Sequence, residues 1–210
     1  MLQENYILHK KKIGDLQVSE LRHNFEVKRT LKPTKYIRII YHHSENRKNI
    51  KDIFDLHYYR YRWACIGYHF VIDKKGKIYQ TRDLDIAGSH THGFNQNSIG
   101  VCLIGNFDKE KPTKDQFDSF VKLVKTLNLE FEIKETIGHS QAVYKQLKHY
   151  FWKLNLPDFN PFEFEDTGDY YNFIRNTNNK ILRFDAGIRT QDKIKLLKTC
   201  PGFWFYKALK

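Results

Sequence analysis

Short apolar runs along the chain predict the strands of a sheet. Five such runs are rich in β-branched and aromatic residues, which is typical of buried strands. They cover residues 37–42, 67–72, 77–81, 98–103 and 132–137. The second and third runs flank the turn sequence Asp73-Lys74-Lys75-Gly76, which predicts a hairpin.

Two other segments carry apolar residues at helical spacing. Residues 49–63 place Ile50, Ile53 and Phe54 on one side, and residues 117–127 repeat this pattern. The second segment follows Thr113 and Gln116, which resemble a capping box. We therefore expect an α/β fold in which helices flank a central mixed sheet.

The two remaining stretches have weaker patterns. Residues 1–34 are polar, basic and only weakly periodic, so we assign them as an N-terminal extension. Residues from about 142 to 194 are rich in aromatic side chains and contain Pro157 and Pro161, which predicts loops with little regular structure. Within them we expect a short helix around Phe173 and a turn at 176–179; a helical turn is expected at 193–197.

The charge of the chain changes the range of expected partners. Its 210 residues carry a formal net charge of +12, which favours an anionic partner such as nucleic acid, a cell-wall polymer or a membrane surface. A solvated basic surface explains the same charge equally well. The charge also makes a nucleic-acid-binding module one functional hypothesis, although no motif of that kind is recognisable.

The cysteines and the N-terminus indicate the expected compartment. Three cysteines argue against a disulfide framework, and Cys65 and Cys102 lie in apolar runs where buried thiols are expected. The first residues lack an apolar stretch, so we expect no signal peptide, and no run is long enough to span a membrane. We expect a cytoplasmic monomer that reaches an external substrate only after the membrane is permeabilised.

Two histidines and a cysteine are candidate metal ligands. His42 stands at the end of a predicted strand, whereas His139 and Cys200 lie much further along the chain. Zinc favours nitrogen and thiolate ligands, and a three-ligand site leaves one position for water or substrate. Such wide spacing is not a local finger motif, so the spacing alone is weak evidence.

Five motifs, taken in order, resemble the type 2 N-acetylmuramoyl-L-alanine amidases, a family that includes peptidoglycan-recognition proteins and short phage lysozymes. The resemblance covers residues 36–140 and 196–204 and is nearest to the phage lysozymes through 97–105. The motifs are His42-His43-Ser44, Gly67-Tyr68-His69-Phe70, Ala87 to His90 before Asn95 to Val101, Gly138-His139-Ser140, and Lys198-Thr199-Cys200-Pro201-Gly202.

The resemblance implies a role for each matching residue. It implies zinc as cofactor, with His42, His139 and Cys200 as ligands. His42 and His43 would face opposite sides of a strand, so only His42 should reach the metal. Tyr68 and Lys198 match catalytic positions: Tyr68 would hold the attacking water or the tetrahedral intermediate by a hydrogen bond, and Lys198 would stabilise the oxyanion. His90 and Asn95 match positions that line the substrate groove; His57, His69, His92 and His149 are expected to be structural or on the surface.

The implied activity is hydrolysis of the amide between N-acetylmuramic acid and L-alanine in peptidoglycan, by a phage or prophage endolysin. A zinc amidase domain is expected at 35–210, with an insertion at about 142–194 that the short phage lysozymes lack. The insertion is a candidate lid, substrate-selecting wall or docking surface for a protein partner. Its aromatics, Trp152, Phe159, Phe162 and Phe164, favour a small packed subdomain over a sugar-binding platform. The alternative function is a peptidoglycan-binding protein or an inhibitor of RNA polymerase, as some phage lysozymes of the family are.

Overall fold

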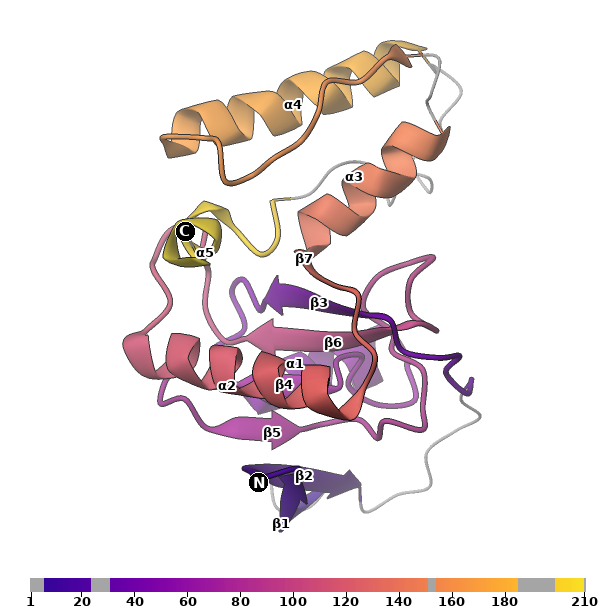
Figure 1. Cartoon of the computed structure of the whole chain (residues 1–210), viewed down its shortest axis with the longest axis vertical. Helices are drawn as coiled ribbons and strands as arrows, with labels where there is room; N and C mark the ends of the chain where they lie inside the picture. The colour runs from indigo at the N-terminus through magenta and orange to yellow at the C-terminus, as the bar shows by residue number, and fades with distance from the viewer. Residues whose placement is uncertain (1–5, 24–30, 151–153, 185–198, 210) are drawn as a thin grey trace.

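A seven-stranded mixed sheet forms the centre of the chain (Figure 1). The computed structural model describes residues 6–23, 31–150, 154–184 and 199–209. The strands lie in the order β1-β2-β5-β4-β6-β3-β7. Their bounds are β1 Tyr6–Ile13, β2 Leu16–His23, β3 Arg38–His43, β4 Phe70–Ile72, β5 Ile78–Gln80, β6 Ser98–Leu103 and β7 Glu135–Gly138. The predicted α/β fold with a mixed sheet is confirmed.

The centre of the sheet is parallel. β3 pairs with both β6 and β7, and β4 pairs with β6, all in parallel. β6 is buried along its whole length, which explains why its sequence after Ser98 is a continuous apolar run rather than an alternating one. β4 and β5 form the predicted antiparallel hairpin around the turn at 73–76.

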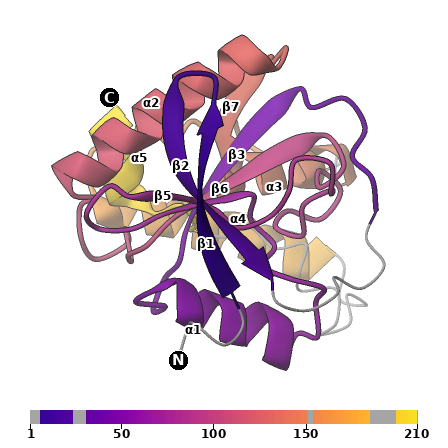
Figure 2. The ribbon, with the colours of Figure 1, turned by 90° about the horizontal axis from the view of Figure 1, so that it is seen from below.

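Helices cover both faces of the sheet (Figure 2). On one face, α1 (Ile50–Phe54) continues into a π-helical segment, Asp55–Arg60, and buries Ile53 and Phe54 in a cluster with Val71 of β4. On the other face, α2 (Lys114–Glu130) packs Phe120 and Leu123 into the main core. The predicted capping box is present: the Thr113 side chain accepts from the Gln116 N–H, and the Gln116 side chain accepts from the Thr113 N–H.

The N-terminal extension contains a hairpin that enlarges the sheet. β1 and β2 pair antiparallel over their full length, turning at Gly14, whose φ of 52° suits glycine. β2 then joins β5 in parallel through the pairs Ser19–Tyr79 and Glu20–Gln80. The hairpin was not predicted, because its apolar side chains do not alternate cleanly with polar ones: Leu8 is exposed and Glu20 is buried.

The prediction of little regular structure at about 142–194 was wrong for the described residues, although the helix expected around Phe173 is present. α3 spans His139–Tyr150, α4 spans Thr167–Phe184, and α5 follows at Phe203–Leu209. The expected turn at 176–179 lies inside α4, because Tyr170, Ile174 and Thr177 bury one face of that helix and outweigh the poor helix propensity of asparagine. The helical turn expected at 193–197 lies outside the described residues. In the described part of the chain, no helix is both long and apolar enough to cross a membrane.

Candidate functional site

The register of the sheet brings His42 and His139 together. β3 and β7 are parallel neighbours, and Tyr41 is paired with Gly138. A histidine follows each of these two residues, His42 in β3 and His139 directly after β7, and the two ring centroids lie 4.6 Å apart. His42 is buried and His139, the first residue of α3, is half-buried.

Cys200 completes a cluster of three side chains that could hold a metal ion. Its thiol sulfur lies 3.7 Å from Nδ1 of His42 and is buried. One ligand atom each from His42, His139 and Cys200 fall within 4.8 Å of one another. The structure therefore brings together the three residues predicted as ligands, although they are widely separated in sequence.

The segment that carries Cys200 is anchored to the start of α3. The Ser140 N–H donates to the Cys200 carbonyl at 2.7 Å, and the Ser140 hydroxyl lies 2.6 Å from that of Tyr206. Gly202 lies against the chain after β6: a Cβ there would sit 2.4 Å from the carbonyl carbon of Phe107, and its φ is 96°. Only glycine fits this close approach, which fixes where the chain leaves Cys200.

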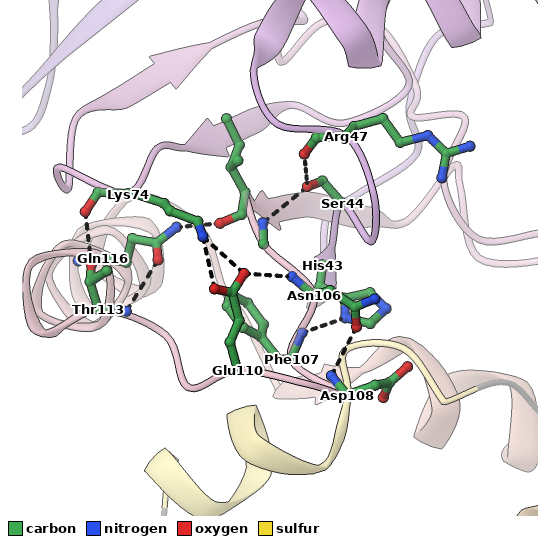
Figure 3. Close-up of polar contacts among 12 residues, drawn as sticks. His43, Ser44, Arg47, Lys74, Asn106, Phe107, Asp108, Glu110, Thr113 and Gln116 are labelled. Carbon is green, nitrogen blue, oxygen red and sulfur yellow. Dashed lines mark hydrogen bonds and ion pairs between the residues drawn. The ribbon is translucent and has the colours of Figure 1, made fainter.

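His43 points away from the cluster, as strand alternation predicted. Its Nδ1 accepts a hydrogen bond from the Phe107 N–H at 3.1 Å (Figure 3). Burial lowers the pKa of His43, with Asp108 and Glu45 opposing the shift. Next to it, the Ser44 hydroxyl accepts from the Gly105 N–H and donates to the Arg47 carbonyl, which fixes the loop leaving β3.

The second ring nitrogen of His42 faces two polar side chains. Nε2 of His42 lies 3.1 Å from Nδ1 of His90 and 3.4 Å from the Thr91 hydroxyl. Burial lowers the pKa of His90 to about 3, so that this imidazole is neutral near pH 7. The Nε2 side of the His42 ring thus contacts His90 and Thr91, while its Nδ1 faces Cys200.

A cavity of about 220 Å³ opens beside the three ligands. Tyr68 forms part of its wall, with its ring centroid 5.0 Å from that of His42. Burial raises the pKa of Tyr68 well above 10, and the Cys102 and Cys200 thiols and the Glu45 carboxylate act in the same direction. Tyr68 therefore meets the cavity as a neutral phenol that donates a hydrogen bond.

Several lining residues carried no sequence signal for this role. His57, expected to be structural, accepts the Gly67 N–H through Nδ1 at 3.1 Å and also faces the cavity. Burial lowers its pKa to about 4, assisted by the positive charges of Arg47 and Arg82. The helix predicted over residues 49–63 is the one sequence pattern that contains His57, Tyr61 and Trp63. The further lining residues include Glu45, Arg47, Tyr61, Trp63 and Ser89.

The remaining predicted site residues are His90, Asn95 and Lys198. His90 lines the cavity, whereas the Asn95 amide oxygen accepts from the backbone N–H groups of His90 and Thr91, each at 2.8 Å. Their predicted contacts with substrate stay predictions. Lys198 lies outside the described residues.

Comparison with known proteins identifies the family. The family model described as N-acetylmuramoyl-L-alanine amidase matches residues 32–149, more than half of the chain. The chain belongs to this amidase family, and the family predicted from the motifs is confirmed.

The relatives include both lytic and recognition proteins. An endolysin of Klebsiella phage KP32 is 36% identical over 75 residues, which is 35% of this chain and 50% of the endolysin. The chain thus spans about half the length of that endolysin. Peptidoglycan-recognition protein 2 of Holotrichia diomphalia is 30% identical over 138 residues, 62% of this chain and 70% of that protein. The solved structure of N-acetylmuramoyl-L-alanine amidase LysC from Clostridium intestinale URNW aligns with a TM-score of 0.55 and 27% identity, covering 62% of this chain and 94% of LysC.

Proposed function

We propose that this protein is a zinc-dependent amidase that cleaves the bond between N-acetylmuramic acid and L-alanine in peptidoglycan, as a phage or prophage endolysin. The observation that carries the proposal is the cluster of His42, His139 and Cys200 at the wall of a cavity. Two imidazoles and a thiol from three separate segments are the donor set that zinc prefers. Three protein ligands leave a position open, which is typical of catalytic rather than structural sites.

The residues around the cluster would divide the work of hydrolysis. A zinc ion held there would polarise the scissile carbonyl and lower the pKa of an attacking water. The Tyr68 hydroxyl, beside His42, would donate a hydrogen bond that orients the reacting oxygen atoms. Lys198, by its match to the catalytic lysine of phage amidases, would stabilise the negative charge that develops on the carbonyl oxygen.

The cavity wall offers contacts for both sides of the scissile amide. Tyr61 and Trp63 provide aromatic surfaces of the kind that pack against sugar rings and peptide. Arg47 and Glu45 provide opposite charges at the same wall, where their side chains lie 3.2 Å apart. His90 and Asn95 are proposed from the family match to line the groove for the substrate.

The test is the release of stem peptides from purified peptidoglycan, followed by mass spectrometry. Zinc-loaded protein should release peptides with a free N-terminal L-alanine, and Cys200→Ala should release none. Cys65→Ser is a matched control, because Cys65 is a buried thiol outside the cavity lining. Equal release by the Cys200→Ala protein would overturn the proposal. Zinc binding without release would favour peptidoglycan recognition without cleavage, as the relatives named recognition proteins suggest.

Inhibition of an RNA polymerase through residues 142–194 stays a prediction. The described aromatic residues of the insertion, Phe159, Phe162 and Phe164, pack against the main core, and the small packed subdomain predicted for them stays a prediction. Trp152 lies outside the described residues. A pull-down that recovers no polymerase, together with unchanged transcription in vitro, would count against the inhibitor role.

A further inference from the structure

We propose that His90 is a positioning residue for His42, holding its imidazole through a chain of hydrogen bonds that ends on the backbone carbonyl of Phe94. This role differs from a contact with substrate, which the family match implies for His90. It rests on the proposed function only in that zinc is the metal held by His42, and it does not require hydrolysis.

The chain of hydrogen bonds has one consistent direction. The Ser98 hydroxyl donates its proton to the Phe94 carbonyl at 2.6 Å, so its oxygen is an acceptor for Nε2–H of His90, 3.5 Å away. His90 then carries its proton on Nε2, and its Nδ1 accepts from Nε2–H of His42 at 3.1 Å. The unprotonated nitrogen of His42 is therefore Nδ1, the atom that faces Cys200. Each link determines the tautomer of the next.

Two glycines fix the place of the His90 ring. A Cβ on Gly88 would lie 2.4 Å from Cδ2 of His90, and a Cβ on Gly100 would lie 2.5 Å from the same atom. Both distances are shorter than any side chain tolerates, so the ring occupies space that only these glycines leave open. Gly100 belongs to β6, the fully buried strand beside β3.

The backbone that carries His90 is fixed as well. The amide oxygen of Asn95 accepts from the N–H groups of His90 and Thr91, both at 2.8 Å, which closes the loop between them. The Thr91 hydroxyl lies 3.1 Å from Nδ1 of His90 and 3.4 Å from Nε2 of His42, beside the bond between the two rings. His90 is thus restrained at its backbone, at its ring and at both ring nitrogens, so it can hold the imidazole of His42 in one orientation.

Zinc affinity distinguishes positioning from substrate contact. Partners that orient a metal-bound histidine are typically worth about 10–100-fold in metal affinity or activity. His90→Leu removes the acceptor for His42 and should weaken zinc binding by about this factor. His90→Asn keeps an oxygen acceptor near the position of Nδ1 and should retain most of the affinity. The measurement is competition for zinc against a chromophoric chelator, with the full-length protein.

The control variants separate folding from positioning. Ser98→Ala breaks only the far end of the chain and should weaken zinc binding less than His90→Leu does; its far-UV circular dichroism should match the wild type. Thr91→Val removes the hydroxyl that lies beside the bond between the His42 and His90 rings. If His90→Leu misfolds, wild-type zinc affinity in both Ser98→Ala and Thr91→Val would overturn the proposal.

The outcomes also separate this proposal from that of the amidase. Wild-type zinc affinity in a folded His90→Leu protein, with a raised KM for peptidoglycan, would make His90 a substrate contact and would overturn positioning, while the amidase stands. Weakened zinc binding in that variant, in a protein that releases no stem peptide even as wild type, would support positioning while the amidase fails. Absence of zinc binding by the wild type would overturn both.

Discussion

The Tyr170 hydroxyl donates a hydrogen bond of 2.7 Å to the carbonyl of Thr199, the residue directly before Cys200. Tyr170 belongs to α4, in the insertion, and is fully buried against Phe203. Thr199 is held from another side by the Asp108 carboxylate, 2.8 Å from its hydroxyl. The insertion thus takes part in placing the third candidate ligand, which makes it more than an appended lid.

Tyr170→Phe tests this support. The change leaves the ring in place and removes the hydrogen bond to the Thr199 carbonyl, whose loss should cost about 1 kcal/mol of unfolding free energy. Because the bond ends next to Cys200, zinc binding should also weaken. Tyr79→Phe is the matched variant, since the Tyr79 hydroxyl donates to Asp73 at 3.1 Å, away from Thr199. Urea unfolding and zinc competition measure the two effects; equal zinc affinities in both variants and the wild type would show that α4 does not support the site.

Zinc should stabilise the folded protein through the three clustered side chains. A ligand present at 100 times its Kd stabilises the native state by about 2.7 kcal/mol, so zinc should raise Tm and a chelator should lower it. Cys200→Ala and His139→Ala should lose most of this shift, whereas Cys65→Ser should keep it. Differential scanning fluorimetry with and without zinc provides the comparison. An undiminished zinc shift in Cys200→Ala would place the metal elsewhere.

Tyr68→Phe should separate catalysis from metal binding. Loss of one hydrogen-bond donor to a developing oxyanion costs about 10²–10³ in turnover. Zinc affinity should not change, because Tyr68 is outside the ligand cluster. Tyr79→Phe is a control on a neighbouring strand, where the hydroxyl donates to Asp73 at 3.1 Å. Wild-type turnover in Tyr68→Phe would remove this phenol from the mechanism.

Local sequence patterns predicted the structure correctly where the burial of one strand decides which residues it contains. The run at 98–103 predicted β6 without error, because both faces of that strand are buried and its sequence after Ser98 has no polar side chain. Strand alternation also separated His42 from His43, and the structure turns the latter toward the Phe107 N–H. In both cases, the information lies in neighbouring residues of one strand.

Long-range contacts account for what the sequence did not reveal. α4 contains a run of polar residues typical of a turn, and it is helical because Tyr170 and Ile174 pack on distant segments. The alignment of His42 with His139 depends on the register of β3 with β7, which no local pattern encodes. The bond between His42 and His90 likewise depends on the space left by Gly88 and Gly100. The placement of His139 and of His90 beside His42 therefore depends on contacts between segments that are distant in the sequence.

The N-terminal hairpin should contribute to stability through one buried carboxylate. Glu20 accepts from Lys11 at 2.6 Å and from Arg22 at 2.7 Å. Burial raises the pKa of Glu20, but the hydrogen bonds and charges of Lys11 and Arg22 outweigh it, so the pKa is lowered below 4.5 overall. A lowered folded-state pKa means that the stabilisation is fully present above the unfolded pKa and is lost as the pH falls through the folded one.

Glu20→Gln should therefore destabilise the protein at pH 7 and much less in acid. Hydrogen bonds to a charged group are worth about 1.5–3 kcal/mol, which sets the scale of the loss at neutral pH. The difference between variant and wild type should shrink as the pH falls below about 4, where the unfolded carboxyl is protonated. Urea unfolding from pH 7 to pH 3 measures it, with Glu132→Gln as the control, because the Glu132 side chain is 76% exposed in its ion pair with Lys35. A pH-independent difference would show that the charge of Glu20, paired with Lys11 and Arg22 within the hairpin, is not the source of this stabilisation.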